Sequence, residues 1–277
     1  MAADLHCHTC SSDGSDPAGE VVLMAKLRGL SAVAVTDHDT FSGVGEAVSC
    51  GEKYGIRVIP GAEFSSTDAA TGRKAHILCY LCSNPDRLDD LCRATCEARR
   101  KAGEAMLEKV MALYPISAEM VLSRAGRSAS LFKQHIMHAL IDAGYAHEFF
   151  GDVFHQLFSA KGGKAYVKVE YPEVHDVIEQ IHRAGGLAVL AHPGEYDSYA
   201  LLDSLSVSRL IDGVEVRHPR SKEGDEQRFA RIARENGLLM TGGTDFHGMY
   251  CKNPMPVGTC TATDEQLEQL IRRGETK

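Results

Sequence analysis

Short apolar runs alternate with longer amphipathic runs along most of the chain. The apolar runs have the length of strands and occupy residues 4–8, 32–37, 57–63, 74–81, 187–192, 213–216 and 238–245. Runs with helical periodicity lie between them at residues 17–30, 43–54, 172–184 and 222–236, and Gly29, Gly55, Gly185 and Gly237 lie at their carboxyl ends, as capping glycines do. This alternation is typical of an α/β fold built on a parallel sheet. Seven such strands favour a TIM-like barrel over an open sheet.

Residues 85–164 depart from the alternation. Helix-like segments at 87–113, 118–124, 131–143 and 148–160 follow one another there without an intervening apolar strand. We therefore predict that residues 1–84 and 165–277 form the barrel, and that residues 85–164 form a helical insertion in one strand-to-strand connection. Active sites of such barrels open at the carboxyl ends of the strands, so we expect the insertion to cap the site. A purely structural addition is the alternative.

Ionisable side chains stand at one end of nearly every predicted strand. His6 and His8 are two positions apart, and side chains with that spacing in a strand share a face. Asp245 and His247 repeat the spacing near the end of the chain. Polar groups next to apolar strands are costly to bury without a purpose, so we predict a metal site. Its candidate ligands are His6, His8, Asp13, His38, Glu63, His76, His192, Asp245 and His247.

The types of these side chains narrow the choice of metal. Imidazole and carboxylate ligands without thiolate suit Mn, Zn or Fe. Nine ligands exceed the needs of one ion with open positions, so two or three divalent metal ions are expected. A cationic centre of this kind suits a phosphate group and the charge of its transition state. A zinc ribbon that pairs Cys7 and Cys10 with Cys79 and Cys82 is a rival interpretation.

Composition limits the possible partners and compartments. The formal net charge of −8 over 277 residues argues against a grip on duplex DNA, which needs many basic side chains. We find neither a secretory leader nor an apolar run long enough to cross a membrane. The nine cysteines are then most simply reduced thiols, so we expect a cytoplasmic protein without membrane contact.

Five segments resemble, in order, the motifs of the polymerase and histidinol phosphatase (PHP) family. They are DLHCHT at residues 4–9, TDHD at 36–39, GAEFS at 61–65, AHPG at 191–194 and TGGTDFHG at 241–248. The resemblance implies a distorted (β/α)7 barrel and a trinuclear metal centre, with the nine candidate ligands at the metal-binding positions. Asp37 also matches a motif position, and we expect it to orient a histidine.

The helical insertion and the phrase AYV at residues 165–167 are similar to the stand-alone phosphoesterase branch of this family. That branch includes 3′,5′-nucleotide bisphosphate phosphatases and exonucleases of short RNA. The expected activity is hydrolysis of a phosphate monoester of a small nucleotide-like substrate by a metal-bridging hydroxide, preferably a 3′,5′-bisphosphate to the 5′-monophosphate. The alternatives are a 5′–3′ exonuclease on short oligoribonucleotides, a non-catalytic metal-stabilised binding module, and an amidohydrolase.

Other residues are assigned roles in catalysis or phosphate binding. Asp39 or His218 is expected to give a proton to the leaving group. Arg217 follows the sixth predicted strand and is the preferred phosphate ligand, because a guanidinium can hold phosphate through two hydrogen bonds. Lys133, Ser130 and Lys164 of the insertion are further candidates for binding substrate phosphate.

Overall fold

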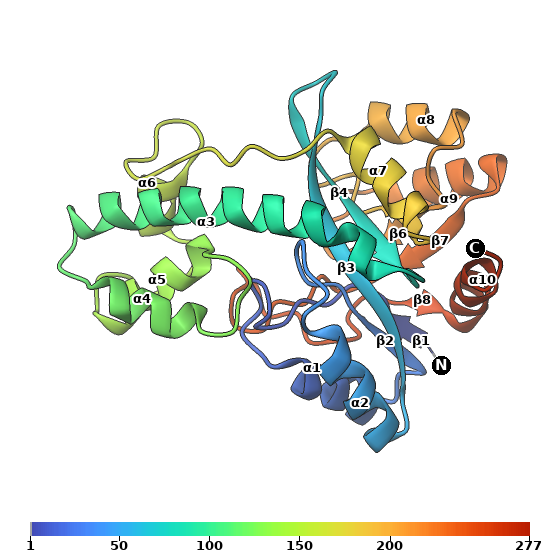
Figure 1. Ribbon diagram of the computed structural model, residues 1–277, viewed down its shortest axis with the longest axis horizontal. Coiled ribbons are helices and arrows are strands. Elements are labelled where there is room, and N and C mark those ends of the chain that lie inside the picture. Colours follow the sequence, from blue (N-terminus) through green and yellow to red (C-terminus); the bar gives the residue numbers. More distant parts are fainter. Residues whose placement is uncertain (1) are drawn as a thin grey trace.

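Eight strands form one curved sheet in the computed structural model, which describes residues 2–277 (Figure 1). Their order across the sheet is β7-β6-β5-β4-β3-β2-β1-β8. The strands are β1 (Ala2–Asp4), β2 (Ala32–Val35), β3 (Arg57–Asp68), β4 (Arg73–Tyr80), β5 (Leu187–Leu190), β6 (Gly213–Arg217), β7 (Leu239–Gly242) and β8 (Ala262–Thr263). The predicted α/β barrel is thus confirmed, with one short additional strand, β8, that the apolar pattern does not reveal.

The barrel closes at the carboxyl ends of β1 and β7. Leu5 N, just beyond β1, donates a hydrogen bond to Gly242 O of β7 at 3.2 Å, and Cys7 forms a parallel bridge with Phe246. At the other end of β1, β8 pairs with it in antiparallel orientation. The segments that follow β1 and β7 therefore lie side by side at the barrel mouth, which brings the two ends of the chain to one site.

β4 runs against its neighbours, unlike the strands of a regular parallel barrel. β3 and β4 form a long hairpin, and both the β3–β4 and the β4–β5 pairs are antiparallel. The pairs β1–β2, β2–β3, β5–β6 and β6–β7 are parallel. Because β4 is reversed, His76 near its beginning reaches the same mouth as residues at the ends of the parallel strands. Ser65 of β3 lies directly opposite His76.

In the part of the chain that the structure describes, ten α-helices cover the barrel or extend from it. They are α1 (Ala18–Leu27), α2 (Val44–Tyr54), α3 (Asp89–Met111), α4 (Ala118–Ala125), α5 (Lys133–Asp142), α6 (Asp152–Phe158), α7 (Val174–Arg183), α8 (Tyr199–Val207), α9 (Asp225–Asn236) and α10 (Asp264–Gly274), and a 3-10 turn, η1 (Pro85–Leu88), precedes α3. Helices α2 and α9 end at Gly55 and Gly237, whose positive φ angles of 64° and 66° favour glycine. None of the helices within residues 2–277 is long and apolar enough to cross a membrane.

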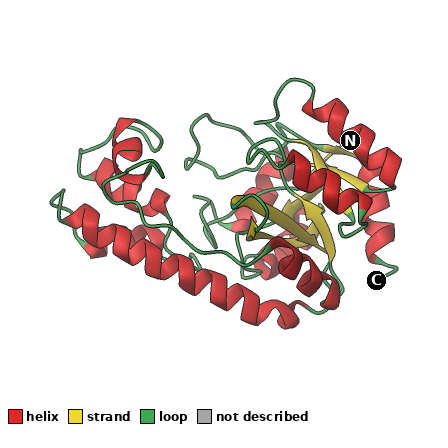
Figure 2. Ribbon diagram, turned by 90° about the horizontal axis from the view of Figure 1, so that it is seen from above, coloured by secondary structure: helices red, strands yellow, loops and turns green. Residues whose placement is uncertain are grey.

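Helices α3 to α6 form a group beside the barrel mouth. α3 reaches out from the barrel, and α4, α5 and α6 lie along its far half (Figures 1 and 2). A separate apolar cluster holds this group together, with Met106, Val110, Ile136, Leu140 and Phe158 among its buried members. The division of the chain at residues 85 and 164 stays a prediction, and Gln134 brings α5 into contact with Asp13 in a ligand-bearing loop of the barrel.

Candidate metal centre

A buried aspartate ties together the segments that carry the first and last candidate ligands. Asp4 Oδ1 accepts hydrogen bonds from His6 N at 3.3 Å and from Thr244 N at 2.9 Å. Asp4 Oδ2 accepts a third hydrogen bond from Gly258 N at 2.7 Å. One carboxylate thus holds together two ligand-bearing segments, and Thr244 lies 240 positions from Asp4 in the sequence.

Gly243 permits the close approach of these segments. A Cβ atom at this position would overlap the backbone nitrogen and the Cβ atom of His6. Because only glycine lacks that atom, this glycine of the TGGTDFHG motif is explained by packing against the first ligand.

Glu63 lies at the centre of the candidate ligands, and its two oxygens face different histidines. Its Oε1 atom lies 2.9 Å from His76 Nδ1 and 2.8 Å from His192 Nε2. Its Oε2 atom lies within 3.3 Å of ring nitrogens of His6, His8 and His38. A carboxylate that faces five imidazoles in this way can bridge two cations.

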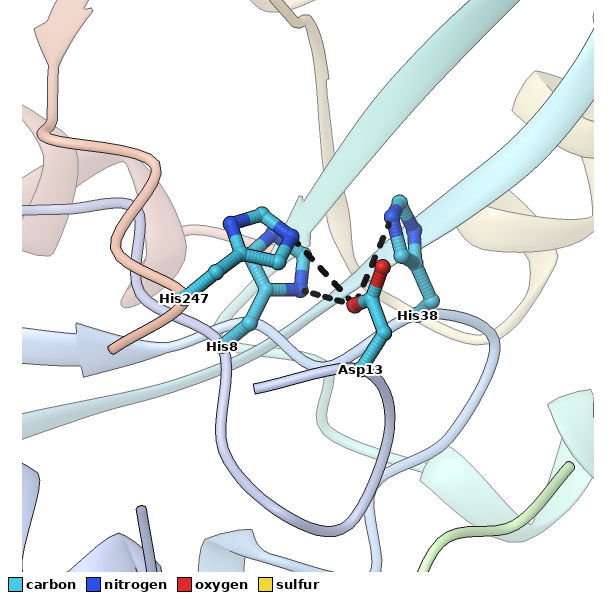
Figure 3. A group of neighbouring side chains, drawn as sticks. All are labelled: His8, Asp13, His38 and His247. Atoms are coloured by element: carbon cyan, nitrogen blue, oxygen red, sulfur yellow. Dashed lines mark ion pairs between the residues drawn. The ribbon is translucent and has the colours of Figure 1, made fainter. Parts of the chain in front are cut away.

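Asp13 and three histidines form a neighbouring group (Figure 3). Asp13 Oδ1 lies 3.3 Å from His247 Nε2, 3.8 Å from His8 Nδ1 and 3.9 Å from His38 Nε2. The rings of His8 and His247 stack with their centroids 4.2 Å apart. Gln134 of α5 donates a hydrogen bond to Asp13 Oδ2 at 3.0 Å, so the group of helices beside the barrel helps to orient a candidate ligand.

All nine candidate ligands fall into groups that could each hold an ion. Atoms within 4.8 Å of one another define four overlapping groups in the described chain: His8, Asp13, His38 and His247; His6, His8, Glu63 and Asp245; His38, Glu63 and His76; His192, Glu195 and Asp245. The buried atoms His8 Nδ1, Asp13 Oδ1, His38 Nδ1, Glu63 Oε2, His192 Nδ1 and Glu195 Oε2 have no hydrogen-bond partner. Such atoms are costly to bury, and imidazole nitrogens and carboxylate oxygens are suitable ligands for divalent cations. The donor set therefore fits metal ions.

The electrostatics keep the acidic ligands charged. Burial alone would raise the pKa of Glu63, but His76, His6 and other imidazoles hold it well below its usual range. Burial likewise opposes the charge on Asp13 and Asp245, yet His247 contributes most to holding the pKa of each below its usual range. A carboxylate must be ionised to bind a metal, and these three are.

Glu215 forms hydrogen bonds with two of the candidate ligands and was not among the predicted residues. This buried residue of β6 places Oε1 3.0 Å from His6 Nδ1, and its Oε2 accepts a hydrogen bond from His192 N at 2.9 Å. A carboxylate on the far nitrogen of an imidazole fixes the tautomer that leaves the other nitrogen free for a metal. The only sequence signal was an acidic residue inside an apolar strand, GVEVR.

Arg220 and Glu195 also border the centre without having been predicted. Arg220 forms ion pairs with Asp245 and, through Nη1 at 3.0 Å, with Glu195 Oε1. Both side chains line a cavity of about 480 Å³ that opens over the candidate ligands. Phe150, His155 and Tyr250 also line the cavity, so it combines ionic groups with aromatic side chains.

The predicted catalytic residues lie in three different settings. Asp37 accepts hydrogen bonds from Thr9 N, Thr9 Oγ1 and Ser12 Oγ at 2.6–2.7 Å, so it holds the loop before Asp13 instead of a histidine ring. Asp39 pairs with buried Arg99 at 2.6 Å. His218 is buried beside the centre, with Nε2 3.3 Å from Asp245 Oδ2.

The predicted phosphate ligands are not brought together. Arg217 pairs with Glu226 of α9 at 2.8 Å and is 42% exposed, outside the residues that line the cavity. Ser130 Oγ donates a hydrogen bond to Cys96 O at 3.0 Å. Lys164 is exposed, whereas Lys133 is half-buried over the ring of Tyr166, 5.1 Å from its centre.

The structure does not support the rival zinc ribbon. All nine cysteines are unpaired, and Cys79 is buried within β4. No cysteine belongs to a group of potential ligands anywhere in residues 2–277. The thiols therefore take no part in the proposed metal centre.

Comparisons with known proteins agree with this geometry. The PHP domain family matches residues 4–191. A phosphoribosyl 1,2-cyclic phosphate 1,2-diphosphodiesterase of Eggerthella lenta is 37% identical over 92% of this chain and 97% of its own. A 3′,5′-nucleoside bisphosphate phosphatase of Chromobacterium violaceum is 29% identical over 88% of this chain and 86% of its own.

A solved structure extends the similarity to the whole fold. A Bifidobacterium adolescentis protein assigned as a metal-dependent phosphoesterase superposes with a TM-score of 0.89 at 30% identity, covering 98% of this chain and 96% of its own. The resemblance inferred from the five motifs is thereby confirmed. The chain belongs to the PHP domain family, and it is a metal-dependent phosphoesterase.

Proposed function

We propose that two or three divalent cations (Mn, Zn or Fe) bind to the nine candidate ligands, and that the protein uses them to hydrolyse a phosphate ester of a small substrate carrying two phosphate groups. The observation that carries this proposal is the set of buried, unpartnered nitrogen and oxygen atoms around Glu63 and Asp13. These atoms face one another without forming hydrogen bonds within residues 2–277, and cations between them would satisfy them.

The residues divide naturally among the proposed ions. His6, His8, Glu63 and Asp245 would hold one ion, and Asp13, His38 and His247 another. Glu63 Oε1 with His76 and His192 would hold a third. Such cations supply an activated water and neutralise charge on the phosphate oxygens.

Side chains of the protein itself would contact the transferred phosphate and the leaving group. Arg220 lines the cavity, so we assign it the contact with the transferred phosphate that was expected of Arg217. Arg220 N donates a hydrogen bond to His218 Nδ1 at 3.2 Å. Nε2 of His218 therefore carries the ring proton and faces the centre, and we assign this residue a hydrogen bond to the leaving-group oxygen, where negative charge develops. Asp39 is a weaker candidate, because Arg99 already pairs with it.

Two substrates are supported by specific observations. The names of the Chromobacterium and Eggerthella relatives both denote a substrate with two phosphate groups, namely a nucleoside 3′,5′-bisphosphate and a phosphoribosyl cyclic phosphate. The bisphosphate agrees with the activity expected from the sequence. The cyclic phosphate is favoured by the higher identity of 37%.

The proposal also covers the compartment and the partners of the enzyme. Nine unpaired thiols suit the reducing cytoplasm. The net charge of −8 disfavours duplex DNA as a partner, and a membrane has no role in the proposed reaction. Short oligoribonucleotides remain an alternative substrate.

One panel of substrates tests the proposal. Purified protein would be assayed with Mn²⁺ on adenosine 3′,5′-bisphosphate, phosphoribosyl 1,2-cyclic phosphate, a short oligoribonucleotide and an amide substrate. We expect hydrolysis of at least one of the two small phosphate esters, and loss of it in Glu63→Gln. Metal uptake without hydrolysis of any phosphate ester would favour the non-catalytic module, and cleavage of the amide alone would favour an amidohydrolase.

A further inference from the structure

Two cysteines lie at the end of β4 that points away from the metal centre. Cys79 is the second-last residue of β4, and Cys82 follows two positions after the strand ends. Between them Leu81 has a positive φ angle of 51°, which ends the extended conformation and turns the chain. Cys79 lies roughly 10 Å along the strand from the candidate ligand His76. Neither cysteine is among the residues that line the cavity.

Both sulfur atoms face the short turn that follows α7. Cys82 Sγ lies 3.3 Å from Ala184 O. A Cβ atom on Gly186 would lie 2.8 Å from Cys79 Sγ, so this glycine leaves room for the sulfur. Asn84 N donates a hydrogen bond to Ala184 O at 3.0 Å, which holds the segment of Cys82 against the same turn. Two residues on either side of a chain reversal thus bring their thiols to one place.

The two thiols interact, and their environments differ. The thiol of Cys79 donates a hydrogen bond to the sulfur of Cys82. Cys79 is completely buried, whereas Cys82 is half-buried and can be reached from solvent. The hydrogen bond lowers the pKa of Cys82 to about 7, although burial opposes this. The same hydrogen bond, together with burial, holds the pKa of Cys79 well above its usual range. The pair therefore combines an accessible thiolate with a buried thiol.

Neighbouring thiols lack this combination. Cys92 packs against the same apolar cluster as Cys79 and Cys82, and Cys96 lies one helical turn further along α3. Burial raises the pKa of Cys92 well above its usual range and that of Cys96 to about 11. The thiolate and not the thiol is the nucleophile in exchange reactions, so Cys82 is expected to react before either of them.

We propose that Cys79 and Cys82 form a reversible thiol–disulfide site that reacts with small disulfides. The Cys82 sulfur attacks one sulfur of the small disulfide, and the other sulfur leaves as a thiolate and takes up the proton that Cys82 has released. Cys79 then attacks the Cys82 sulfur of the mixed disulfide, and its proton passes to the second departing thiolate. The small disulfide is reduced to two thiols while the two cysteines are oxidised to one disulfide, so atoms and electrons balance.

This inference does not depend on the proposed function. The two sulfurs touch neither the candidate ligands nor the cavity, and no metal ion enters the exchange. Disulfides in reducing compartments are usually transient and respond to the redox state. The pair would accordingly be reduced in the reducing cytoplasm proposed above and would close when small disulfides accumulate.

The test exposes the reduced protein, supplemented with Mn²⁺, to glutathione disulfide at neutral pH. We expect the wild-type protein to lose two of its nine titratable thiols and to become lighter by two hydrogen atoms. A peptide map should then join Cys79 to Cys82. Excess reduced glutathione should restore both thiols.

Three variants separate the roles of the two sulfurs. Cys82→Ser removes the attacking sulfur, so Cys79 should form neither a disulfide nor a glutathione adduct. Cys79→Ala leaves the mixed disulfide without a second thiol, so a glutathione adduct should remain on Cys82. Cys92→Ser removes a neighbouring half-buried thiol and is the matched control, which should form the disulfide as the wild-type protein does.

Alkylation measures the reactivity of Cys82 without any disulfide. At neutral pH we expect iodoacetamide to modify Cys82 of the wild-type protein about tenfold or more faster than Cys92, because the thiolate is the reacting form. Cys79→Ala should slow the modification of Cys82 about tenfold, since the hydrogen bond that favours the thiolate is lost. An equal rate for Cys82 and Cys92 in the wild-type protein would contradict the assignment of Cys82 as the attacking sulfur.

The wild-type protein alone can decide against the inference. A disulfide between any other pair, glutathione adducts confined to other cysteines, or an unchanged mass would overturn it. A stable adduct on Cys82 of the wild-type protein would overturn it as well, because Cys79 would then not be the second thiol. None of these outcomes bears on the hydrolysis of phosphate esters, so the proposed function is tested separately.

Discussion

Replacing Glu215 by glutamine tests whether the metal centre depends on a residue that touches only its ligands. The Oε1 atom of Glu215 lies 3.0 Å from His6 Nδ1, and Oε2 accepts the N–H of His192 at 2.9 Å. Glutamine is nearly isosteric, and its amide oxygen can keep one of these contacts. Its NH₂ group, however, would face the ring nitrogen of His6.

The consequence follows from the hydrogen-bonding capacity of the two groups. An amide NH₂ can only donate, so His6 would have to accept through Nδ1 and carry its proton on Nε2. His6 Nε2 is the atom that lies 3.3 Å from Glu63 and 3.5 Å from Asp245, and a protonated nitrogen cannot bind a metal. Loss of a partner behind a ligand typically weakens metal binding about 10- to 100-fold, equivalent to about 1.4–2.7 kcal/mol.

The assay is a titration of metal-stripped protein with Mn²⁺ in competition with a coloured chelator. The Mn²⁺ dependence of substrate hydrolysis should shift by the same factor. Glu226→Gln is the matched control, because Glu226 pairs with Arg217 of the same strand but lies 51% exposed and away from the centre. Equal metal affinity in Glu215→Gln and wild type would refute the role assigned to Glu215.

Three further predictions concern removal of the metal, the packing at Gly243 and the ionisation of Asp212. A chelator should abolish hydrolysis and added Mn²⁺ should restore it, and activity indifferent to chelation would contradict a metal-dependent reaction. Gly243→Ala should lower the free energy of unfolding by about 1–3 kcal/mol in urea titrations, because its methyl group would overlap His6. The control is Gly45→Ala, where a methyl group meets open space and should not destabilise the protein. Despite burial, hydrogen bonds from His182 and Lys277 lower the pKa of Asp212 to about 2, below the value of 3.8 in the unfolded chain. The stabilisation of the fold by ionised Asp212 is therefore complete above about pH 4 and is lost as the pH falls through about 2. Asp212→Asn should lower the free energy of unfolding by about 2 kcal/mol in urea titrations at pH 7. A cost that persists at pH 2 would contradict this explanation.

The periodicity of the sequence located most of the fold, because local preferences decide where helices and strands form. α7 presents Val174, Val177, Ile178 and Ile181 to the core, and this spacing is visible in the sequence. α8 was not predicted. It buries Leu201, Leu202 and Leu205, but its short run has no polar face regular enough to reveal a helix.

The direction of β4 could not be deduced from periodicity. An apolar run has the same pattern whichever way it lies in a sheet, so only the pairing of β4 with β3 and β5 reveals that it is antiparallel. His76 nevertheless lies beside His38 and Glu63, because its reversed strand begins at the mouth where the parallel strands end.

An irregularity in β6 changes the direction in which Arg217 points. Glu215 and Arg217 should share a face by strand alternation, and Glu215 does face the centre. The pairing of β6 with β7 shifts between these two residues, and an extra residue in a strand reverses the alternation beyond it. Arg217 therefore turns outward to Glu226, and Arg220 takes the place beside the cavity.

The sequence by itself determined the type of chemistry, because imidazoles and carboxylates at the ends of apolar strands have few other uses and the barrel collects strand ends at one mouth. Only the tertiary structure decided which side chains support those ligands and that Arg220, and not Arg217, lines the cavity over them. Glu215 contacts His6 and Arg220 contacts Asp245, and no local pattern encodes these contacts.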